Sequence, residues 1–286
     1  MKQVLSSDKN INVNRRRHKT IKGVLLLMVF VMMMAPFIFY QSQEVDIEVS
    51  EAQIVDKIPK QERPLHSVDI PDFMAIADIN QRKQAFFNFL KPAIDAENQR
   101  LATIRNRLLS IQSEYQQQRA LDTVQVEWLN NLAKQYKLDD ANAIDVSIAK
   151  LLLRVDEIPR ELVLVQAANE SAWGSSRFAR IGLNFFGIWC FKKGCGLVPK
   201  GRESGLQHEV ASFSSVEQMI RHYFHNLNTN GAYNMLRKIR AQLRQHNLPL
   251  RPSVLATGLL PYSERGIDYV VEINTMLRHN EKYIKS

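Results

Sequence analysis

An uncharged apolar run near the N-terminus constrains the fold of this 286-residue chain more than any other feature. Residues 23–43 contain no charged side chain, and residues 24–40 are apolar almost throughout. This length matches the roughly 20 residues that an α-helix needs to cross the hydrocarbon core of a bilayer. We therefore predict a transmembrane helix over residues 23–43, followed by a folded region outside the membrane.

The charges on either side of this run predict its orientation. Basic residues cluster between Arg15 and Lys22, whereas acidic residues begin at Glu44. Because basic flanks stay in the cytoplasm, residues 1–22 should form a cytoplasmic tail, with the remainder in the periplasm as a single-pass inner-membrane protein. A cleaved signal peptide would show the same polarity. No small-residue pair of the Ala-x-Ala kind lies at a suitable distance, so a retained anchor is favoured, although residues 32–35 leave some room for cleavage.

The net charge of +9 is concentrated in the tail and does not predict nucleic-acid binding. The first 22 residues carry seven basic side chains and one acid, so most of the positive charge lies there. The folded part is only mildly basic, and a polyanion-binding surface would need clustered basic residues within the fold. We expect no nucleic-acid partner.

The region after the membrane segment begins with a linker and continues with helices. Residues 44–71 are polar, with isolated prolines and no sustained period, which predicts an extended linker. Residues 72–155 are expected to form a helical region packed on the domain that follows. A long helix should begin near Pro92, because apolar residues recur at helical spacing. These residues are Ile94, Leu101, Ile104, Leu108, Ile111 and Tyr115.

Two further helices are predicted in this region, at Val126–Tyr136 and Ala143–Val155. Asp139 and Asp140 lie between them as candidate helix caps. The apolar stripe of the long helix spans only about three heptads, which is too short to argue for a coiled-coil dimer. We therefore expect it to pack within its own chain, and the protein to be a monomer.

Strand signals are confined to one short hairpin. Residues Gly196–Glu203 and Leu206–Phe213 flank a Ser204-Gly205 turn, in which glycine can supply the positive φ that such turns need. The stretch that follows has helical periodicity, with Ser214 and Glu217 at capping-box spacing. The fold class is therefore α+β and mostly helical, with a small β lobe.

The chain has two cysteines, Cys190 and Cys195, which lie close enough in sequence to bridge each other. A local disulfide is favoured over a metal site, because no other ligand stands near them at zinc-site spacing. A pair of free thiols is the remaining alternative. His222 and His225 have a spacing that suits a metal pair, but nothing completes a site around them. No metal or other cofactor is predicted.

One carboxylate stands out in a segment that should form an enclosed helix. The helix is predicted from Pro159 to a C-capping Gly174, and its residues 162–165 are apolar on every side. Glu170 lies near its C-terminal end, where desolvation and the helix dipole both raise a carboxyl pKa. A protonated acid is what glycosidic-bond cleavage requires. The alternative is a structural glutamate satisfied by neighbouring Asn or Ser side chains.

The wider pattern around this acid resembles a known family. The stretch 166–175 reads QAANESAWGS, and the stretch 184–188 reads NFFGI. Both resemble the bacterial glucosaminidase family of cell-wall hydrolases, with Asn169 and Ala172 as departures from its usual pattern. The resemblance covers Pro159 to the C-terminus, so residues 156–286 are expected to form the catalytic domain. The cysteine loop and the upstream helices resemble the Bax-type branch of that family.

The resemblance implies a lysozyme-like fold, in which a helical lobe and a β lobe flank a glycan groove. It also implies that Glu170 is the general acid. A second carboxylate is expected on the β lobe, where Glu203 is favoured over Glu209 because it adjoins the turn. The family has a tyrosine near its C-terminal helices that lines the site, and Tyr262 fits this role better than Tyr269, which follows a helical core pattern.

Three residues beside the proposed acid are candidate substrate contacts: Trp189, Phe186 and Asn184. Aromatic faces are good platforms for sugar rings, although most aromatic residues at such places belong to the core, as we expect of Trp173. The expected activity is that of an endo-β-N-acetylglucosaminidase cleaving β-1,4 bonds in peptidoglycan. The alternatives are a lytic transglycosylase on the same substrate and a non-catalytic glycan-binding scaffold.

Overall fold

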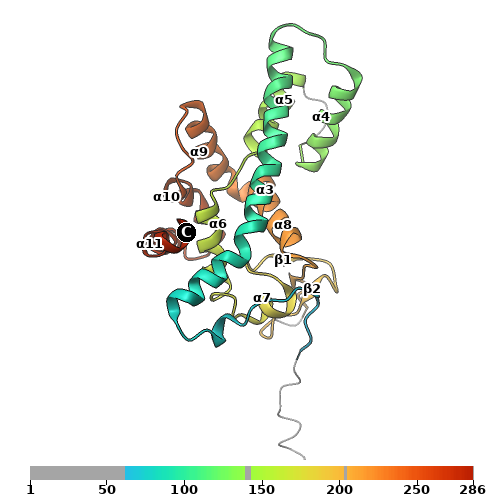
Figure 1. The fold of residues 1–286 in the computed structure, drawn as a ribbon. Coiled ribbons are helices and arrows are strands. Elements are labelled where there is room, and N and C mark those ends of the chain that lie inside the picture. Colours follow the sequence, from blue (N-terminus) through green and yellow to red (C-terminus); the bar gives the residue numbers. More distant parts are fainter. Residues whose placement is uncertain (1–61, 139–142, 203–204, 286) are drawn as a thin grey trace, which may run out of the picture. The chain divides into compact units, whose positions relative to one another are not determined.

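The computed structural model describes residues 62–138, 143–202 and 205–285 (Figure 1). The predicted cytoplasmic tail, transmembrane helix and most of the linker lie outside these residues, as do Asp139, Asp140, Glu203 and Ser204. Within the described part, no helix combines the length and apolar character needed to cross a membrane.

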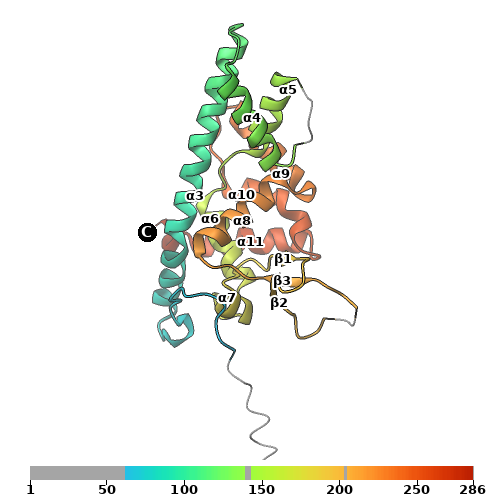
Figure 2. The same ribbon diagram turned by 90° about the vertical axis from the view of Figure 1, so that its right-hand side faces the viewer.

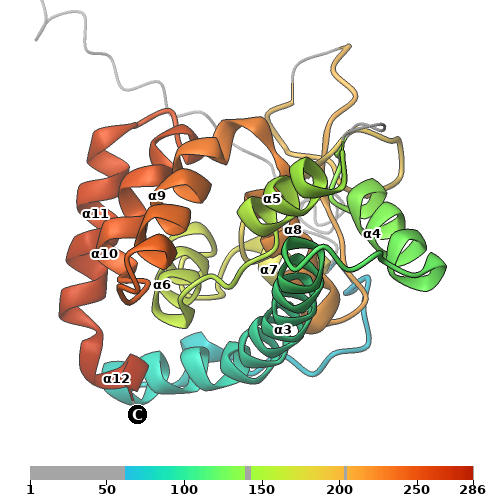
Figure 3. The same cartoon turned by 90° about the horizontal axis from the view of Figure 1, so that it is seen from above.

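The longest element is helix α3, Ile79–Gln116, which is capped by Asp78 through a 2.7 Å hydrogen bond from the Gln81 amide. The predicted start near Pro92 is wrong, because Pro92 lies inside the helix. A proline removes one backbone hydrogen bond and kinks a helix without ending it when packing holds both halves. α3 is visibly bent (Figures 1 and 3). Most of the predicted apolar stripe is buried, whereas Tyr115 is exposed.

The two helices predicted after α3 are confirmed. They are α4, Thr123–Gln135, and α5, Ile144–Arg154. Asp122 and Gln125 form a reciprocal capping box that fixes the start of α4. α5 packs against both α3 and α4, so these helices form one helical group that precedes Glu170 in the sequence.

The enclosed helix is also confirmed, as α6, Arg160–Glu170. Every residue from Leu162 to Ala168 is buried, because α6 lies between α3 and the pair α10, Pro252–Leu255, and α11, Ile267–His279 (Figure 3). The helix ends at Glu170, earlier than the predicted glycine cap. Gly174 still adopts a positive φ, but only as the last residue of an irregular turn.

The remaining helical elements are short helices and 3-10 turns, apart from α8 and α9. They are η1 Phe73–Ala75, α7 Arg177–Gly182, α8 Val216–Thr229, η2 Gly231–Tyr233, α9 Asn234–Gln245, η3 Ala256–Tyr262 and α12 Glu281–Lys285. α8 buries one face, as its sequence pattern predicted. The predicted cap at Ser214 is wrong by one residue, because it is the Ser215 side chain that accepts from the Gln218 amide at the start of the helix. The buried side chains form one continuous core that extends from α3 to the C-terminal helices.

The β lobe is a three-stranded antiparallel sheet in the order β1-β3-β2 (Figure 2). Its strands are β1 Trp189–Cys190, β2 Gly196–Leu197 and β3 Glu209–Ala211. The antiparallel pairing of β2 with β3 was predicted, but both strands are shorter than expected, and the pairing of β1 with β3 was not anticipated. A side chain at Gly196 would collide with the Val210 carbonyl oxygen, so only glycine allows this pairing. Cys190 and Cys195 form the predicted disulfide.

Candidate active site

The geometry of α6 places Glu170 at the point where a buried helix meets an irregular turn. The side chain is half-buried, and it follows seven consecutive buried residues of the helix. Four tyrosines interact with its charge, and each comes from a different element. They are Tyr223 of α8, Tyr233 of η2, Tyr262 of η3 and Tyr269 of α11. The carboxyl group thus lies at one side of a tyrosine cluster.

The tyrosine cluster is held together by ring stacking and by one buried amide. The rings of Tyr262 and Tyr269 stack in parallel with centroids 5.5 Å apart. Gln166, fully buried on α6, donates a 2.9 Å hydrogen bond to the Tyr269 hydroxyl and accepts one from the Tyr223 hydroxyl. Because buried polar groups need partners, Gln166 fixes the positions of both hydroxyls relative to α6.

Burial raises the pKa of Glu170 above its ordinary value. Hydrogen bonding from Tyr269 opposes this shift, as do Asn169 and the positive charge of Arg265, while the charge of Glu272 reinforces it. Desolvation therefore dominates, which is the effect predicted from the enclosed helix. A carboxyl group with a raised pKa can hold a proton closer to neutral pH and deliver it to a leaving group.

The turn that follows Glu170 is strained. Ala172, Trp173 and Gly174 adopt φ values of 48°, 57° and 80° in succession, a left-handed conformation that residues with side chains disfavour. The Ser171 hydroxyl stabilises the turn, because it donates to the Ala167 carbonyl at 2.6 Å and accepts from the Gly174 amide at 2.8 Å. Strain of this kind persists only where the surroundings impose it, and it is frequent at functional sites.

Comparison with known proteins decides the family. Residues 146–281 match the glucosaminidase family described as mannosyl-glycoprotein endo-beta-N-acetylglucosaminidase. The protein Bax of Escherichia coli (strain K12) is 34% identical over 219 residues, which cover 76% of this chain and 77% of Bax. The chain belongs to the glucosaminidase family. No solved structure matches it.

Asn184 supports the site instead of lining it. The side chain is buried, and its amide nitrogen donates to the carbonyls of Ile188 and Ala211 at 2.9 and 2.8 Å. Its oxygen accepts from the amides of Phe186 and Ile188. Since every hydrogen-bonding position of the amide is used, Asn184 positions the 184–188 loop against β3 and has no group left for the predicted substrate contact.

The two aromatic candidates in this stretch differ in exposure. Phe186 is 2% exposed and stacks on Tyr223 with centroids 3.9 Å apart, so its ring belongs to the core, contrary to prediction. Its carbonyl accepts a 3.0 Å hydrogen bond from the Tyr262 hydroxyl. Trp189 is 50% exposed, and its ring lies 4.3 Å from that of His208. Trp173 packs on Phe86 and Phe87, as expected of a core residue.

Both C-terminal tyrosines lie at the acid, although only Tyr262 was preferred as a site residue. Tyr269 is fully buried, as its helical pattern predicted, yet its hydroxyl acts on the pKa of Glu170. Tyr262 is half-buried and stacks on Tyr269. The sequence pattern correctly predicted burial of Tyr269 but could not show that a core tyrosine reaches the acid.

Of the two candidate second carboxylates in the β lobe, the structure describes only Glu209. Glu203 lies outside the described residues. Glu209 is 4% exposed, and its carboxylate accepts 2.9 Å hydrogen bonds from the amides of Gly194 and Gly196, which lower its pKa. Glu209 therefore fixes the disulfide loop to β3. Its carboxylate and the two cysteine sulfurs are close together, but the sulfurs are bonded to each other, so they do not form a metal site.

Two charged residues near Glu170 were not predicted. Arg265 and Glu272 form an ion pair, and both charges act on Glu170. Arg265 also lies over the Tyr269 ring, 5.7 Å from its centroid. Glu272 stands one helical turn after Tyr269 on α11, a spacing that places two side chains on one face of a helix. This three-residue spacing could have indicated from the sequence that Glu272 lies on the same face of α11 as Tyr269.

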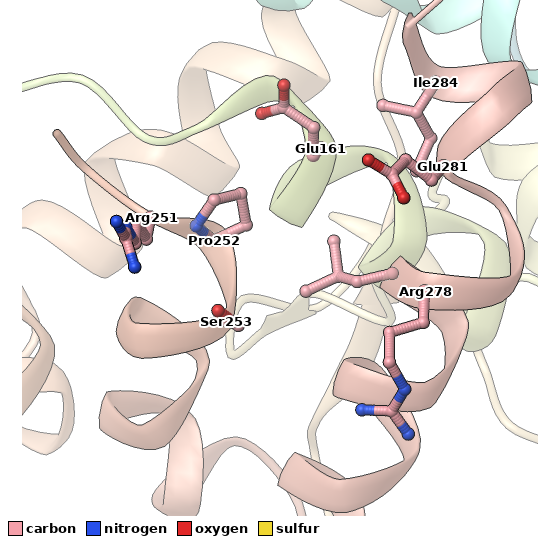
Figure 4. Close-up of a pocket in the computed structure, with 8 residues that line it drawn as sticks. Glu161, Arg251, Pro252, Ser253, Arg278, Glu281 and Ile284 are labelled. Carbon is pink, nitrogen blue, oxygen red and sulfur yellow. The ribbon is translucent and has the colours of Figure 1, made fainter.

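Two hollows in the described residues lie away from the tyrosine cluster. A hollow of about 490 Å³ lies at the opposite end of α6, beside Glu161 (Figure 4). Arg251 and Arg278 stand on opposite sides of it, and the acids Glu161 and Glu281 come from α6 and α12. His222 and His225 line a smaller hollow with Glu97 and Arg100, which are paired to each other. Neither hollow includes a residue of the tyrosine cluster.

Proposed function

We propose that this protein is a peptidoglycan hydrolase, an endo-β-N-acetylglucosaminidase that cleaves β-1,4 glycosidic bonds with Glu170 as its general acid. The observation that carries the proposal is a half-buried carboxyl with a raised pKa at the end of an enclosed helix, beside four tyrosines. Membership of the glucosaminidase family is consistent with a glycoside hydrolase acting on glycans.

In the proposed reaction, Glu170 donates its proton to the glycosidic oxygen as the bond to the anomeric carbon breaks. Water supplies the new hydroxyl at that carbon, and its proton restores the acid over the cycle. Tyr262 donates a hydrogen bond to the Phe186 carbonyl and stacks on Tyr269, which in turn acts on the pKa of Glu170, so the tyrosines link the acid to the 184–188 loop. Glu203 remains our candidate for the residue that activates water or stabilises positive charge on the sugar.

The 50% exposure of Trp189 supports a role in holding a sugar ring. We further propose that the helical elements and the β lobe flank the glycan in a lysozyme-like arrangement. The protein would act from the periplasmic side of the inner membrane, tethered through residues 23–43. Protease protection tests this topology: the part beyond Glu44 should be digested in intact spheroplasts, and protection there would reverse the orientation.

A lytic transglycosylase is the second candidate. It would need a single acid and no activated water. The pairing of Glu272 with Arg265 favours a transglycosylase. Glu272 is the acid whose charge acts on Glu170, and its ion pair with Arg265 makes it a poor base for activating water. A non-catalytic scaffold would have no use for a carboxyl with a raised pKa beside the tyrosine cluster.

Digestion of purified peptidoglycan by the full chain, followed by mass spectrometry of the products, tests these candidates. New reducing N-acetylglucosamine ends support the proposed glucosaminidase. Anhydro-muramic ends identify a transglycosylase, and undigested wall that still binds the protein identifies a scaffold. Glu161→Gln is the matched control for Glu170→Gln, because Glu161 lies in the first turn of the same helix.

A further inference from the structure

We propose that the segment Glu62–Ala75, called here the strap, is a positioning element of the active site, and that Phe73 holds the turn after Glu170 in its strained conformation. This inference rests on the proposed function of Glu170. The strap precedes α3 and lies outside residues 146–281, which match the family. Its role is therefore argued from contacts in this chain.

The strap is attached to α7, the helix that follows the strained turn (Figure 2). The Leu65 amide donates to the Ile181 carbonyl at 2.8 Å, and His66 Nε2 lies 3.0 Å from the Arg180 carbonyl. Glu62 forms an ion pair with Arg177. These contacts join residues more than a hundred positions apart in sequence, so they hold the strap in a defined path beside the turn.

Phe73 lies directly against the turn. Its side chain is 2% exposed, and a methyl group added to Gly174 would come within 2.6 Å of its ring. The Asp72 side chain accepts from the amides of Met74 and Ala75, which fixes the short helix η1 and with it the direction of Phe73. The ring therefore closes over the backbone of Gly174.

Phe73 also belongs to an aromatic cluster that fixes Trp173, the central residue of the turn. The Phe73 ring lies 5.3 Å from that of Phe86 on α3, and the Phe86 ring lies 5.5 Å from that of Trp173. Phe87 contacts Trp173 from the same helix at 5.3 Å. These edge-on and tilted contacts favour one orientation of each ring.

The turn needs this support because its conformation is unfavourable by itself. Ala172 and Trp173 both take left-handed φ values, and such residues relax unless packing holds them. Glu170 lies two residues before Ala172, so a relaxed turn would move the end of α6 and expose the carboxyl to water. Phe73 lies on the turn and acts on the acid through it, which makes Phe73 a positioning residue.

The test compares Phe73→Leu with Met74→Ala in the full chain purified in detergent. Met74 is the next residue of the strap and is 55% exposed, so its truncation leaves the packing on Gly174 in place. Hydrogen exchange of residues 171–176 should increase at least about 10-fold in Phe73→Leu and stay at the parent rate in Met74→Ala. The Trp173 and Ser176 amides report it, since they donate to the Ala168 and Ser171 carbonyls.

Wall digestion by the same variants adds a catalytic readout. In Phe73→Leu, kcat should fall roughly 10- to 100-fold with KM unchanged, because misplacement of a catalytic group affects the chemical step. The alkaline limb of the pH–rate profile should move to lower pH, because a more hydrated Glu170 loses part of its raised pKa. Simple loss of stability would reduce the active fraction without moving that limb. Phe73→Met, which refills part of the space, should fall between the parent and Phe73→Leu.

Parent-like exchange in residues 171–176 of Phe73→Leu would overturn the proposal, and so would equal effects of Met74→Ala. A parent protein that cleaves no wall glycan would instead remove the proposed function. The exchange measurement still decides whether the strap holds the turn, so the two failures can be told apart.

Discussion

At the scale of single residues, the raised pKa of Glu170 was predictable, because it follows from the place of this residue in the sequence. A carboxyl at the end of a helix with no polar face must be desolvated, and this conclusion needs no knowledge of its neighbours. Asn184 and Phe186 lie in an equally distinctive motif, yet both are buried. A motif marks residues that the fold requires, and it does not separate those that touch a ligand from those that place the loop.

Glu170→Gln should abolish most activity while leaving the fold intact. General acid catalysis contributes typically ~10²- to 10⁴-fold, and the amide cannot donate that proton. The raised pKa also means that the native state disfavours the ionised form, so the parent loses stability as the pH rises through that pKa. The Tm of Glu170→Gln should therefore equal that of the parent at about pH 4 and exceed it at about pH 8. Calorimetry at both pH values, alongside sugar release, checks this, and full activity would make Glu170 structural.

Tyr269→Phe should raise the pKa of Glu170 further, because the hydroxyl that favours the ionised form is removed. The alkaline limb of the pH–rate profile should then move to higher pH. The change also leaves the buried Gln166 amide without its acceptor, at a cost of about 1–3 kcal/mol in the free energy of unfolding. Tyr115→Phe, at an exposed tyrosine of α3, is the control. If the alkaline limb of the pH–rate profile does not move, the Tyr269 hydroxyl does not influence the pKa of Glu170.

At the scale of elements, helices were easier to predict than strands. The apolar spacing of α4, α5 and α8 is repeated over several turns, so their existence followed from the sequence. The strands of the β lobe have only two or three residues each, and their pairing depends on a close backbone approach at Gly196 and on the Glu209 contacts. Such contacts are tertiary and leave no period in the sequence. The start of α3 was misjudged for the same reason, since packing decides whether a proline such as Pro92 limits a helix or lies inside it.

Glu209→Gln should loosen the disulfide loop with a smaller effect on activity than Glu170→Gln. The carboxylate of Glu209 accepts one hydrogen bond on each oxygen, from the backbone N–H groups of Gly194 and Gly196. A glutamine side chain has only one acceptor oxygen, so one of these hydrogen bonds is lost. The lowered pKa of Glu209 adds stability above its unfolded pKa, and this stability disappears as the pH falls through the native value. Faster hydrogen exchange in residues 192–197 at neutral pH is expected. Glu217→Gln, on the exposed face of α8, is the control, and loss of activity as large as for Glu170→Gln would give Glu209 a catalytic role.

At the scale of the whole molecule, one buried acid joins α3 and the end of α5 to α9. Asp156, in the connection between α5 and α6, forms ion pairs with Arg105 of α3 at 3.4 Å and with Arg240 and Arg244 of α9 at 3.7 and 2.7 Å. Arg240 also donates to the carbonyls of Leu153 and Arg154, which end α5. The sequence predicted helices before and after Asp156, but it did not show that they meet at this residue. The arginines and their partners are separated by about 50 to 90 residues, and contacts over such separations leave no periodic pattern in the sequence.

Asp156→Asn should therefore destabilise the protein by about 3–5 kcal/mol, because it leaves the fully buried Arg240 without its counter-charge. Burial acts to raise the pKa of Asp156, but Arg240, Arg244 and Arg105 together hold it below its usual value. Its contribution is thus complete above the unfolded pKa of about 3.9 and is lost as the pH falls through the lower native pKa. In urea unfolding, the difference between parent and variant should stay constant from about pH 8 to 5 and shrink below about pH 4. Asp95→Asn is the control, since the Asp95–Arg160 pair is partly exposed and should contribute under about 1 kcal/mol. Equal effects of the two variants, or a difference that does not shrink in acid, would show that Asp156 does not join these helices electrostatically.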